Sequence, residues 1–176
     1  MGENPGTGSG SNLLDALENR GDGTAFAEQI FALVGDSKFF ADFNRDDISM
    51  LARYMRIYRA LPGQVIIREG DSGDYMLLII KGEIGVSRKN PRGESQYLTS
   101  VTDGMTLGEM SMIDGEARIA TCVARQETTF GALSRANMRK ILVENPSLGA
   151  KVLIRLVTML SQRLRHTSAI LLQYMR

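Results

Sequence analysis

Hydrophobic positions change their spacing twice along the chain. Between residues 24 and 53 they recur near helical spacing, and acidic residues open a second short segment at residues 46–52, so we expect two N-terminal helices. Between residues 54 and 134, short apolar runs alternate with turns rich in Gly, Pro and Asp, which predicts seven or eight strands. After residue 134 the helical spacing returns.

The apolar runs of the middle region are too short for helices. They lie at residues 65–67, 75–80, 84–87, 96–101, 119–123 and 128–133. Short strands separated by regular turns are typical of an antiparallel sandwich or jelly roll. We therefore expect an α+β fold, in which an antiparallel β jelly-roll barrel is flanked by N-terminal helices and a long C-terminal helix.

The C-terminal region predicts a short helix at residues 137–143, which ends before Asn145 because the residue preceding a proline is disfavoured in a helix. A long helix then runs from residue 147 to residue 176. Its apolar residues alternate in steps of four and three, with Thr167 at one position, in the series Leu153, Val157, Leu160, Leu164, Leu171 and Tyr174. Such a heptad stripe favours a parallel homodimer through this helix.

The length of 176 residues fits a single domain. Residues 1–12 contain four glycines, one proline and three Ser or Thr, which predicts a disordered tail, and we extend that tail over residues 1–23. Residues 24–176 then form the domain. It divides into N-terminal helices at 24–53, a β-roll at 54–134 and C-terminal helices at 135–176.

Composition removes several classes of function. With 21 basic and 20 acidic side chains, the chain has no charge excess for nucleic acid. His166 and Cys122 are the lone histidine and cysteine, so one chain cannot assemble a zinc or copper site. No Gly-x-Ser-x-Gly or P-loop motif, secretory signal or membrane-length apolar stretch occurs. We expect a cytoplasmic protein that is not an enzyme and uses no metal, cofactor, nucleic acid or membrane.

The segment at residues 107–124 carries the candidate chemistry. Gly108 allows a ligand to approach the backbone, and the residues after it can form a helical turn whose N–H groups face an anion. The carboxylate of Glu109 can accept a hydrogen bond from a sugar hydroxyl, and the guanidinium of Arg118 can hold two phosphate oxygens. Together they suit a ribose phosphate, and one arginine suits a singly charged cyclic phosphodiester.

Residues 39–174 resemble the cyclic nucleotide-binding domain of the catabolite activator protein, protein kinase A regulatory subunits and nucleotide-gated channels. One motif runs from Glu69 through Gly-Asp-Ser-Gly to Asp74 and leads into an apolar strand followed by Lys81-Gly-Glu83. The other resembles the family's phosphate-binding cassette, here residues 107–124, with the spacing from Glu109 to Arg118 found in the kinase regulatory subunits. The cassette's frequent proline is Ala117 here.

The resemblance implies a role for each site residue. It assigns the ribose 2′-hydroxyl to Glu109, the exocyclic phosphate oxygens to Arg118, and adenine contacts to Thr167 and Ser168. Ile119 stands where kinases selective for cyclic GMP have a threonine, which favours cyclic AMP as ligand over cyclic GMP. The predicted ligand-binding residues are Gly108, Glu109, Met110, Ser111, Arg118, Ile119, Ala120, Thr121, Thr167 and Ser168.

Two functions remain open from the sequence. The first is a sensor of a cyclic mononucleotide that changes the pose of its C-terminal helix and acts on a downstream protein not identified by the sequence. The alternative is an interaction module that keeps the fold without the ligand. The family's DNA-binding members continue into a winged helix-turn-helix, and this chain ends at Arg176, so we expect no direct DNA contact. We interpret Arg155, Arg163 and Arg165 as a solvated face, with contact to an acidic partner as the alternative.

Overall fold

The computed structural model describes residues 13–174, with side chains to residue 172. Nine strands of these residues form two antiparallel sheets. In order across the first sheet they are β1 (Glu18–Asp22), β2 (Arg56–Ala60), β9 (Thr128–Ser134), β4 (Tyr75–Lys81) and β7 (Thr106–Leu107). The second sheet has β3 (Val65–Ile67), β8 (Thr121–Ala124), β5 (Glu83–Lys89) and β6 (Ser95–Thr102). The predicted α+β jelly roll is confirmed.

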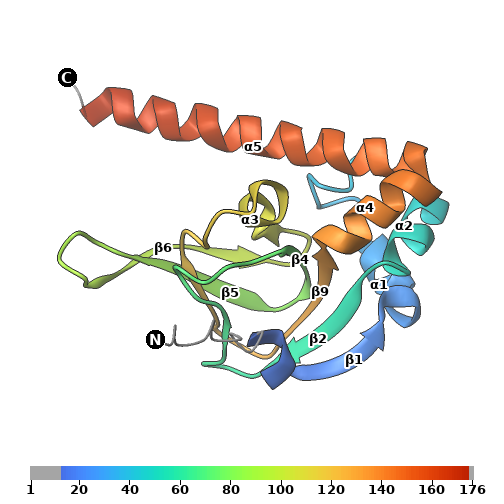
Figure 1. Ribbon diagram of the computed structural model, residues 1–176, viewed down its shortest axis with the longest axis horizontal. Coiled ribbons are helices and arrows are strands. Elements are labelled where there is room, and N and C mark those ends of the chain that lie inside the picture. Colours follow the sequence, from blue (N-terminus) through green and yellow to red (C-terminus); the bar gives the residue numbers. More distant parts are fainter. Residues whose placement is uncertain (1–12, 175–176) are drawn as a thin grey trace, which may run out of the picture.

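Helices lie at one end of the roll and across it (Figure 1). The N-terminal part has two short 3-10 helices, η1 (Leu13–Ala16) and η2 (Gly23–Phe26), followed by α1 (Ala27–Ala32) and α2 (Arg45–Ala52). The others are α3 (Glu109–Asp114), α4 (Arg135–Glu144) and α5 (Pro146–Tyr174). Figure 1 shows α5, which has 29 residues, running over α3 with its C-terminal end away from α4.

Strand β4 separates two hydrophobic cores. Leu77 and Ile79 face the interior of the roll, where Phe130 and Tyr58 stack with ring centroids 5.9 Å apart. The alternate residues of β4 face the helices, and Phe40, Ile48, Leu51, Ile141, Val152 and Leu156 are buried with them. Because side chains of a strand alternate between faces, six consecutive apolar residues of β4 can all be buried.

The helix ends follow local sequence signals. Asn44 and Asp47 form a capping box at the start of α2, in which each side chain accepts a hydrogen bond from the other's backbone N–H, at 2.8 and 2.9 Å. The side chain of Ser134 accepts from the N–H of Asn137 at the start of α4. α4 ends at Glu144, two residues before Pro146, as the proline predicts.

The predicted tail at residues 1–23 is wrong for residues 13–23. Leu14 and Leu17 are buried in the core of the roll, and β1 pairs with β2 in antiparallel register. All five residues of β1 are exposed, so the strand has no alternating apolar pattern for a sequence analysis to detect. Its register shifts between Asn19 and Gly21, where Gly21 has φ of 93°. Residues 1–12 lie outside the described residues.

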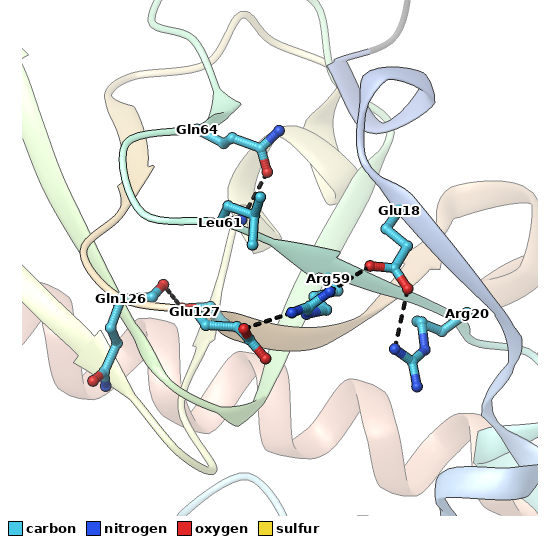
Figure 2. A network of polar contacts seen from close by, with 8 residues as sticks. Glu18, Arg20, Arg59, Leu61, Gln64, Gln126 and Glu127 are labelled. Carbon is cyan, nitrogen blue, oxygen red and sulfur yellow. Dashed lines mark hydrogen bonds and ion pairs between the residues drawn. The ribbon is translucent and has the colours of Figure 1, made fainter.

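An ion-pair network holds β1 against its neighbours (Figure 2). The guanidinium of Arg59 on β2 lies 2.8 Å from the carboxylate of Glu18 and 2.6 Å from that of Glu127, which precedes β9. Arg59 lowers the pKa of both carboxyl groups through these hydrogen bonds. Arg20 adds a contact to Glu18 at 3.1 Å. Backbone pairing and charge thus order a strand that buries no side chain.

One face of α5 packs on the domain and another is uncovered. Val152 and Leu156 are fully buried, and Leu153 and Leu160 are half-buried. Three members of the heptad stripe are exposed, namely Val157 at 64%, Leu164 at 68% and Leu171 at 60%. The side chain of Tyr174, the last member, lies outside the described part of the chain. The uncovered stripe therefore begins one turn later than the sequence pattern indicates.

Candidate functional site

A cavity of about 650 Å³ lies between the second sheet, α3 and α5. This volume falls within the roughly 300–1,000 Å³ range of small-molecule sites. Its walls combine apolar side chains of β5 and β6 with the polar start of α3 and the inner face of α5. The lining includes Val86, Leu98, Thr99, Ser100, Met105, Leu107, Gly108, Glu109, Arg118, Ile119, Cys122, Arg163, His166 and Thr167.

Glycines shape both ends of α3. Gly108 precedes the helix and Gly115 follows it, each with φ of 82°, a left-handed conformation that favours glycine. A Cβ at position 108 would also lie 2.7 Å from a terminal nitrogen of Arg118 and 3.2 Å from the carbonyl oxygen of Tyr75. Conformation and space therefore both require glycine at position 108, and the start of α3 lies directly against Arg118.

Arg118 is a buried cation, with 4% of its surface exposed. Its guanidinium donates to the carbonyl oxygens of Gly108, at 3.0 Å, and Tyr75, at 2.8 Å, and stacks 4.4 Å from the centre of the Tyr75 ring. No carboxylate of residues 13–172 forms an ion pair with it. A buried charge without a counterion is costly, so this arrangement suits an anionic ligand, for which further N–H donors remain.

Backbone contacts fix the position of Arg118. Its N–H donates to the carbonyl oxygen of Asp71, and its carbonyl oxygen accepts from the N–H of Gly70, both at 2.8 Å. The neighbouring Gly73 has no side chain because a Cβ there would lie 2.0 Å from the Nε atom of Arg118. The turn at residues 69–74 thus surrounds the arginine, and the close approach of Arg118 requires glycine at position 73.

Glu109 is more deeply buried, at 2% exposure, and is neutralised within the chain. One carboxylate oxygen accepts from the hydroxyl of Thr106, and the other lies 3.2 Å from a terminal nitrogen of Arg163 on α5. The same guanidinium donates to the carbonyl oxygen of Thr106 at 3.0 Å. Each carboxylate oxygen has two lone pairs, so Glu109 can still accept a hydrogen bond from a ligand hydroxyl.

The cavity offers no activated nucleophile. Burial raises the pKa of Cys122 to about 12, so this thiol stays protonated at neutral pH. The pKa of Tyr75 is also raised, because the effect of burial outweighs the opposite influence of Arg118. Within residues 13–174 no three His, Cys, Asp or Glu side chains come together in a way that could hold a metal ion.

Eight of the ten predicted ligand residues line the cavity, and Thr121 and Ser168 do not. The hydroxyl of Thr121 accepts a hydrogen bond from the N–H of Glu69 at 3.0 Å, so its role is to fasten the turn at residues 69–74. Ser168 lies on an exposed face of α5. Thr167 does line the cavity, and its hydroxyl donates to the carbonyl oxygen of Arg163.

The interpretation of three arginines as a solvated face is wrong for Arg155 and incomplete for Arg163, whose side chain is 47% exposed but also contacts the cavity. Arg155 forms an ion pair with Asp42, and its side chain is only 18% exposed. Arg163 reaches the cavity and binds Glu109, whereas Arg165 stays on the surface and contacts Ser161 of the same helix. The spacing from Arg163 to Thr167 is four residues, which places both on one helix face, and that spacing was the available signal.

Arg163 also borders a second cavity of about 530 Å³, on the side of α5 nearer the N-terminal helices. The two cavities share Met105, Thr106, Arg163 and His166. The underside of α5 around Arg163 is therefore loosely packed on both sides.

None of the helices in residues 13–174 combines the length and apolar character needed to cross a bilayer.

Comparisons with known proteins agree with this geometry. Residues 59–145 match the model of the cyclic nucleotide-binding domain. The cAMP-dependent protein kinase regulatory subunit of Blastocladiella emersonii is 29% identical over 120 residues, which cover 68% of this chain and 30% of that protein. The chain spans less than half the length of the curated relatives that it matches.

Two solved structures extend the similarity to the whole fold. The catabolite activator protein of Thermus thermophilus is 26% identical, with a TM-score of 0.71 over 77% of this chain and 62% of that chain. A cyclic nucleotide-binding domain from Methylobacillus flagellatus is 38% identical, with a TM-score of 0.81 over 92% of this chain and 94% of that chain. The fold, the cavity and these matches together show that the chain belongs to the cyclic nucleotide-binding domain family.

Proposed function

We propose that this domain is a cytoplasmic, non-catalytic sensor that binds cyclic AMP in the cavity beneath α5. The observation that carries the proposal is Arg118, a buried guanidinium without a carboxylate partner among residues 13–172. A cyclic phosphodiester supplies the single negative charge that this cation lacks. Glu109, at the same end of the cavity, supplies an acceptor for the ribose 2′-hydroxyl.

Isothermal titration calorimetry with cyclic AMP tests the proposal, after any co-purified nucleotide has been removed by unfolding and refolding. We expect one site per chain and much weaker binding of 5′-AMP, whose doubly charged, open phosphate does not match one buried arginine. If cyclic AMP gives no heat of binding and does not change the melting temperature of the domain, the result would instead favour the second candidate function, an interaction module that binds no ligand.

Selectivity for the base is expected to follow from Ile119. This side chain lines the cavity, is 52% exposed and has no hydroxyl to offer the guanine amino group. We therefore expect cyclic AMP to bind about fivefold to tenfold more tightly than cyclic GMP, as one missing hydrogen bond implies. Competition against a fluorescent cyclic AMP analogue measures the ratio, and Ile119→Thr should narrow it. Equal or reversed affinities would contradict the assignment.

Gly73→Ala is expected to weaken cyclic AMP binding without touching the ligand. The new Cβ would overlap the Nε atom of Arg118, 2.0 Å away, and displace the guanidinium from the cavity wall. Overpacking of this kind costs about 1–3 kcal/mol, so affinity should fall by roughly fivefold to 100-fold. Gly35→Ala is the matched control, because no atom lies within 4 Å of a Cβ there. Unchanged affinity in Gly73→Ala would exclude Arg118 from the site.

We further propose that ligand occupancy alters the pose of α5. The Arg163 pair ties the C-terminal half of α5 to Glu109, which is the residue assigned to the ribose. A ligand at Glu109 changes the environment of that pair. The loosely packed cavities on both sides of Arg163 leave room for the helix to respond. A ligand shifts this equilibrium only by its differential affinity for the two poses.

The uncovered stripe of α5 supports a parallel homodimer. Val157, Leu164 and Leu171 are all at least 60% exposed and recur at heptad spacing. Thr167, one position of the same stripe, lines the cavity. A second copy on this stripe would therefore lie close to the bound nucleotide, so dimer contacts and ligand binding would be coupled. In this proposal the downstream partner is a separate protein that distinguishes the two poses of α5 by binding them with different affinity.

A further inference from the structure

The second cavity, of about 530 Å³, has three walls from distant parts of the chain. One wall is the connection between α1 and α2 at residues 36–39, in a stretch that Figure 1 shows beneath α5. Another is formed by residues 104–106, where the chain passes from β6 to β7, and the third is the inner face of α5. The volume lies within the roughly 300–1,000 Å³ range of small-molecule sites, and the proposed nucleotide site does not account for it.

Backbone contacts fix two of these walls. The buried hydroxyl of Ser37 donates to the carbonyl oxygen of Gly104 at 2.5 Å and so joins them. A Cβ at Gly104, whose φ is 76°, would lie 3.0 Å from the Cβ atom of Ser37. Strand β4 holds the second wall, because Gly104 donates to the carbonyl oxygen of Ile79 at 2.8 Å and Ile79 donates to that of Met105 at 2.9 Å. The fold itself therefore keeps both walls in place.

The inner face of α5 changes from apolar to polar where it reaches the cavity. Val152 and Leu156 are fully buried, and Arg163 lies two turns after Leu156 on the same face. Gln162 and His166 line the cavity beside Arg163. A helix face that is turned toward the body of a domain is normally apolar. Three polar side chains on this face are typical of a site for a polar ligand.

The charged groups of the cavity favour an anion of low charge. Lys38 lies in the wall, and none of the carboxylates among residues 13–172 pairs with its ammonium group. Arg163 uses one N–H for Glu109 and one for the carbonyl oxygen of Thr106, so other donors of its guanidinium remain. Glu109 offsets the charge of Arg163, and Asp36 adds one carboxylate to the wall. A singly charged head group matches this balance better than a polyanion.

The remaining wall is apolar. The ring of Phe39 is buried and packs against those of Phe40 and Phe43, with centroids 5.0 and 5.7 Å away, so its position is fixed. Met105 and Met159 also line the cavity, and methionine side chains adapt to the shape of an apolar neighbour. An occupant therefore needs an apolar part as well as a charged head group.

We propose that the second cavity binds a small organic carboxylate. Its head group binds between Lys38 and Arg163, and its apolar part lies against Phe39 and the two methionines. Lys38 and Phe39 line this cavity and not the first one, so the site is separate from the proposed nucleotide site. None of these observations involves Arg118, so the inference goes beyond the proposed function and does not depend on it.

NMR titration of the domain with benzoate, an aromatic carboxylate, tests the site. We expect saturable shifts of the amides of residues 36–39, 104–106 and 162–166, with a dissociation constant of about 1 mM for so small a ligand. Benzyl alcohol lacks the charge and should bind at least about tenfold more weakly. Phenyl phosphate carries a second charge and should also bind more weakly than benzoate. Tighter binding of phenyl phosphate, no saturable shifts, or shifts confined to residues 107–124 would overturn the proposal.

Two variants test the head-group contacts. Lys38→Ala should weaken benzoate binding by about tenfold, as the loss of a charged hydrogen bond implies, and should leave cyclic AMP affinity unchanged. Lys140→Ala on α4 is the matched control, because this exposed lysine lines neither cavity. Asp36→Asn removes a carboxylate from the wall and should bind benzoate at least as tightly as the unmodified domain. Unchanged affinity in Lys38→Ala, or weaker binding in Asp36→Asn, would contradict the proposed site.

These results separate failure of the inference from failure of the proposed function. If cyclic AMP does not bind in calorimetry, the proposed function fails, and the benzoate titrations still decide whether the second site exists. If cyclic AMP binds and Lys38→Ala binds benzoate like the unmodified domain, the proposed function stands and the second site is rejected. Loss of benzoate binding in Arg118→Ala but not in Lys38→Ala would place the anion in the first cavity and also reject the second site.

Discussion

Arg118→Ala is expected to lower the affinity for cyclic AMP by tens to thousands of fold while the ligand-free domain stays folded. Removing one partner of a buried, charge-assisted contact costs about 2–5 kcal/mol, and each 1.4 kcal/mol is about a tenfold change in affinity. Without ligand we expect the domain to stay folded, because the substitution removes a buried cation that has no carboxylate partner among residues 13–172. Calorimetry and thermal unfolding of the same sample separate the two effects.

Arg118→Lys is the informative companion variant. It keeps the positive charge but cannot reproduce the two-pronged contact, so its affinity should lie between those of the unmodified domain and Arg118→Ala. Glu109→Ala should also weaken binding, by less than Arg118→Ala. This substitution also removes the partner of Arg163, so the hydrogen-exchange rates of the backbone amides of α5 should change even without ligand. If both Arg118 variants bind like the unmodified domain with intact melting temperatures, the ligand lies elsewhere.

Leu164→Asp is expected to convert a dimer into a monomer. Leu164 is 68% exposed at the middle of the uncovered stripe, and a parallel dimer would bring the two copies of this residue together. Burying two like charges there costs several kcal/mol, enough to raise the dissociation constant by more than about 100-fold. Sedimentation velocity at micromolar concentration measures the state of each variant.

The control for the dimer is Leu172→Asp, on the same helix. Leu172 is 64% exposed but lies off the heptad stripe, so its substitution should leave the dimer intact. Cyclic AMP affinity should change in Leu164→Asp only if dimer contacts and the cavity are coupled. A monomeric unmodified domain would reject the dimer, and an unchanged affinity in a monomeric Leu164→Asp variant would reject the coupling.

Most of the fold could be predicted because its signals are local and strong. The apolar runs of β3, β4 and β9 and the turns between them mark the roll, and Pro146 marks the boundary between α4 and α5. β1 could not be predicted in this way, since its order comes from backbone pairing with β2 and from Arg59. A polar edge strand leaves no periodic pattern in the sequence.

The cassette motif indicated Glu109 and Arg118, and the structure places both in one cavity wall. What the motif could not indicate is how each charge is balanced. Arg163 pairs with Glu109 from 54 residues away in the sequence, and that contact depends on the path of α5. Thr121 shows the opposite case, because its place in the motif suggested a ligand contact and its hydroxyl instead fastens the backbone of Glu69.

A crystal structure of the domain with cyclic AMP tests the central claim most directly. We expect the exocyclic phosphate oxygens at hydrogen-bond distance, about 2.7–3.2 Å, from the guanidinium of Arg118. We expect the ribose 2′-hydroxyl on the carboxylate of Glu109 and the base against Ile119 and Thr167. An empty cavity at saturating nucleotide, or a nucleotide whose phosphate does not touch Arg118, would contradict the account.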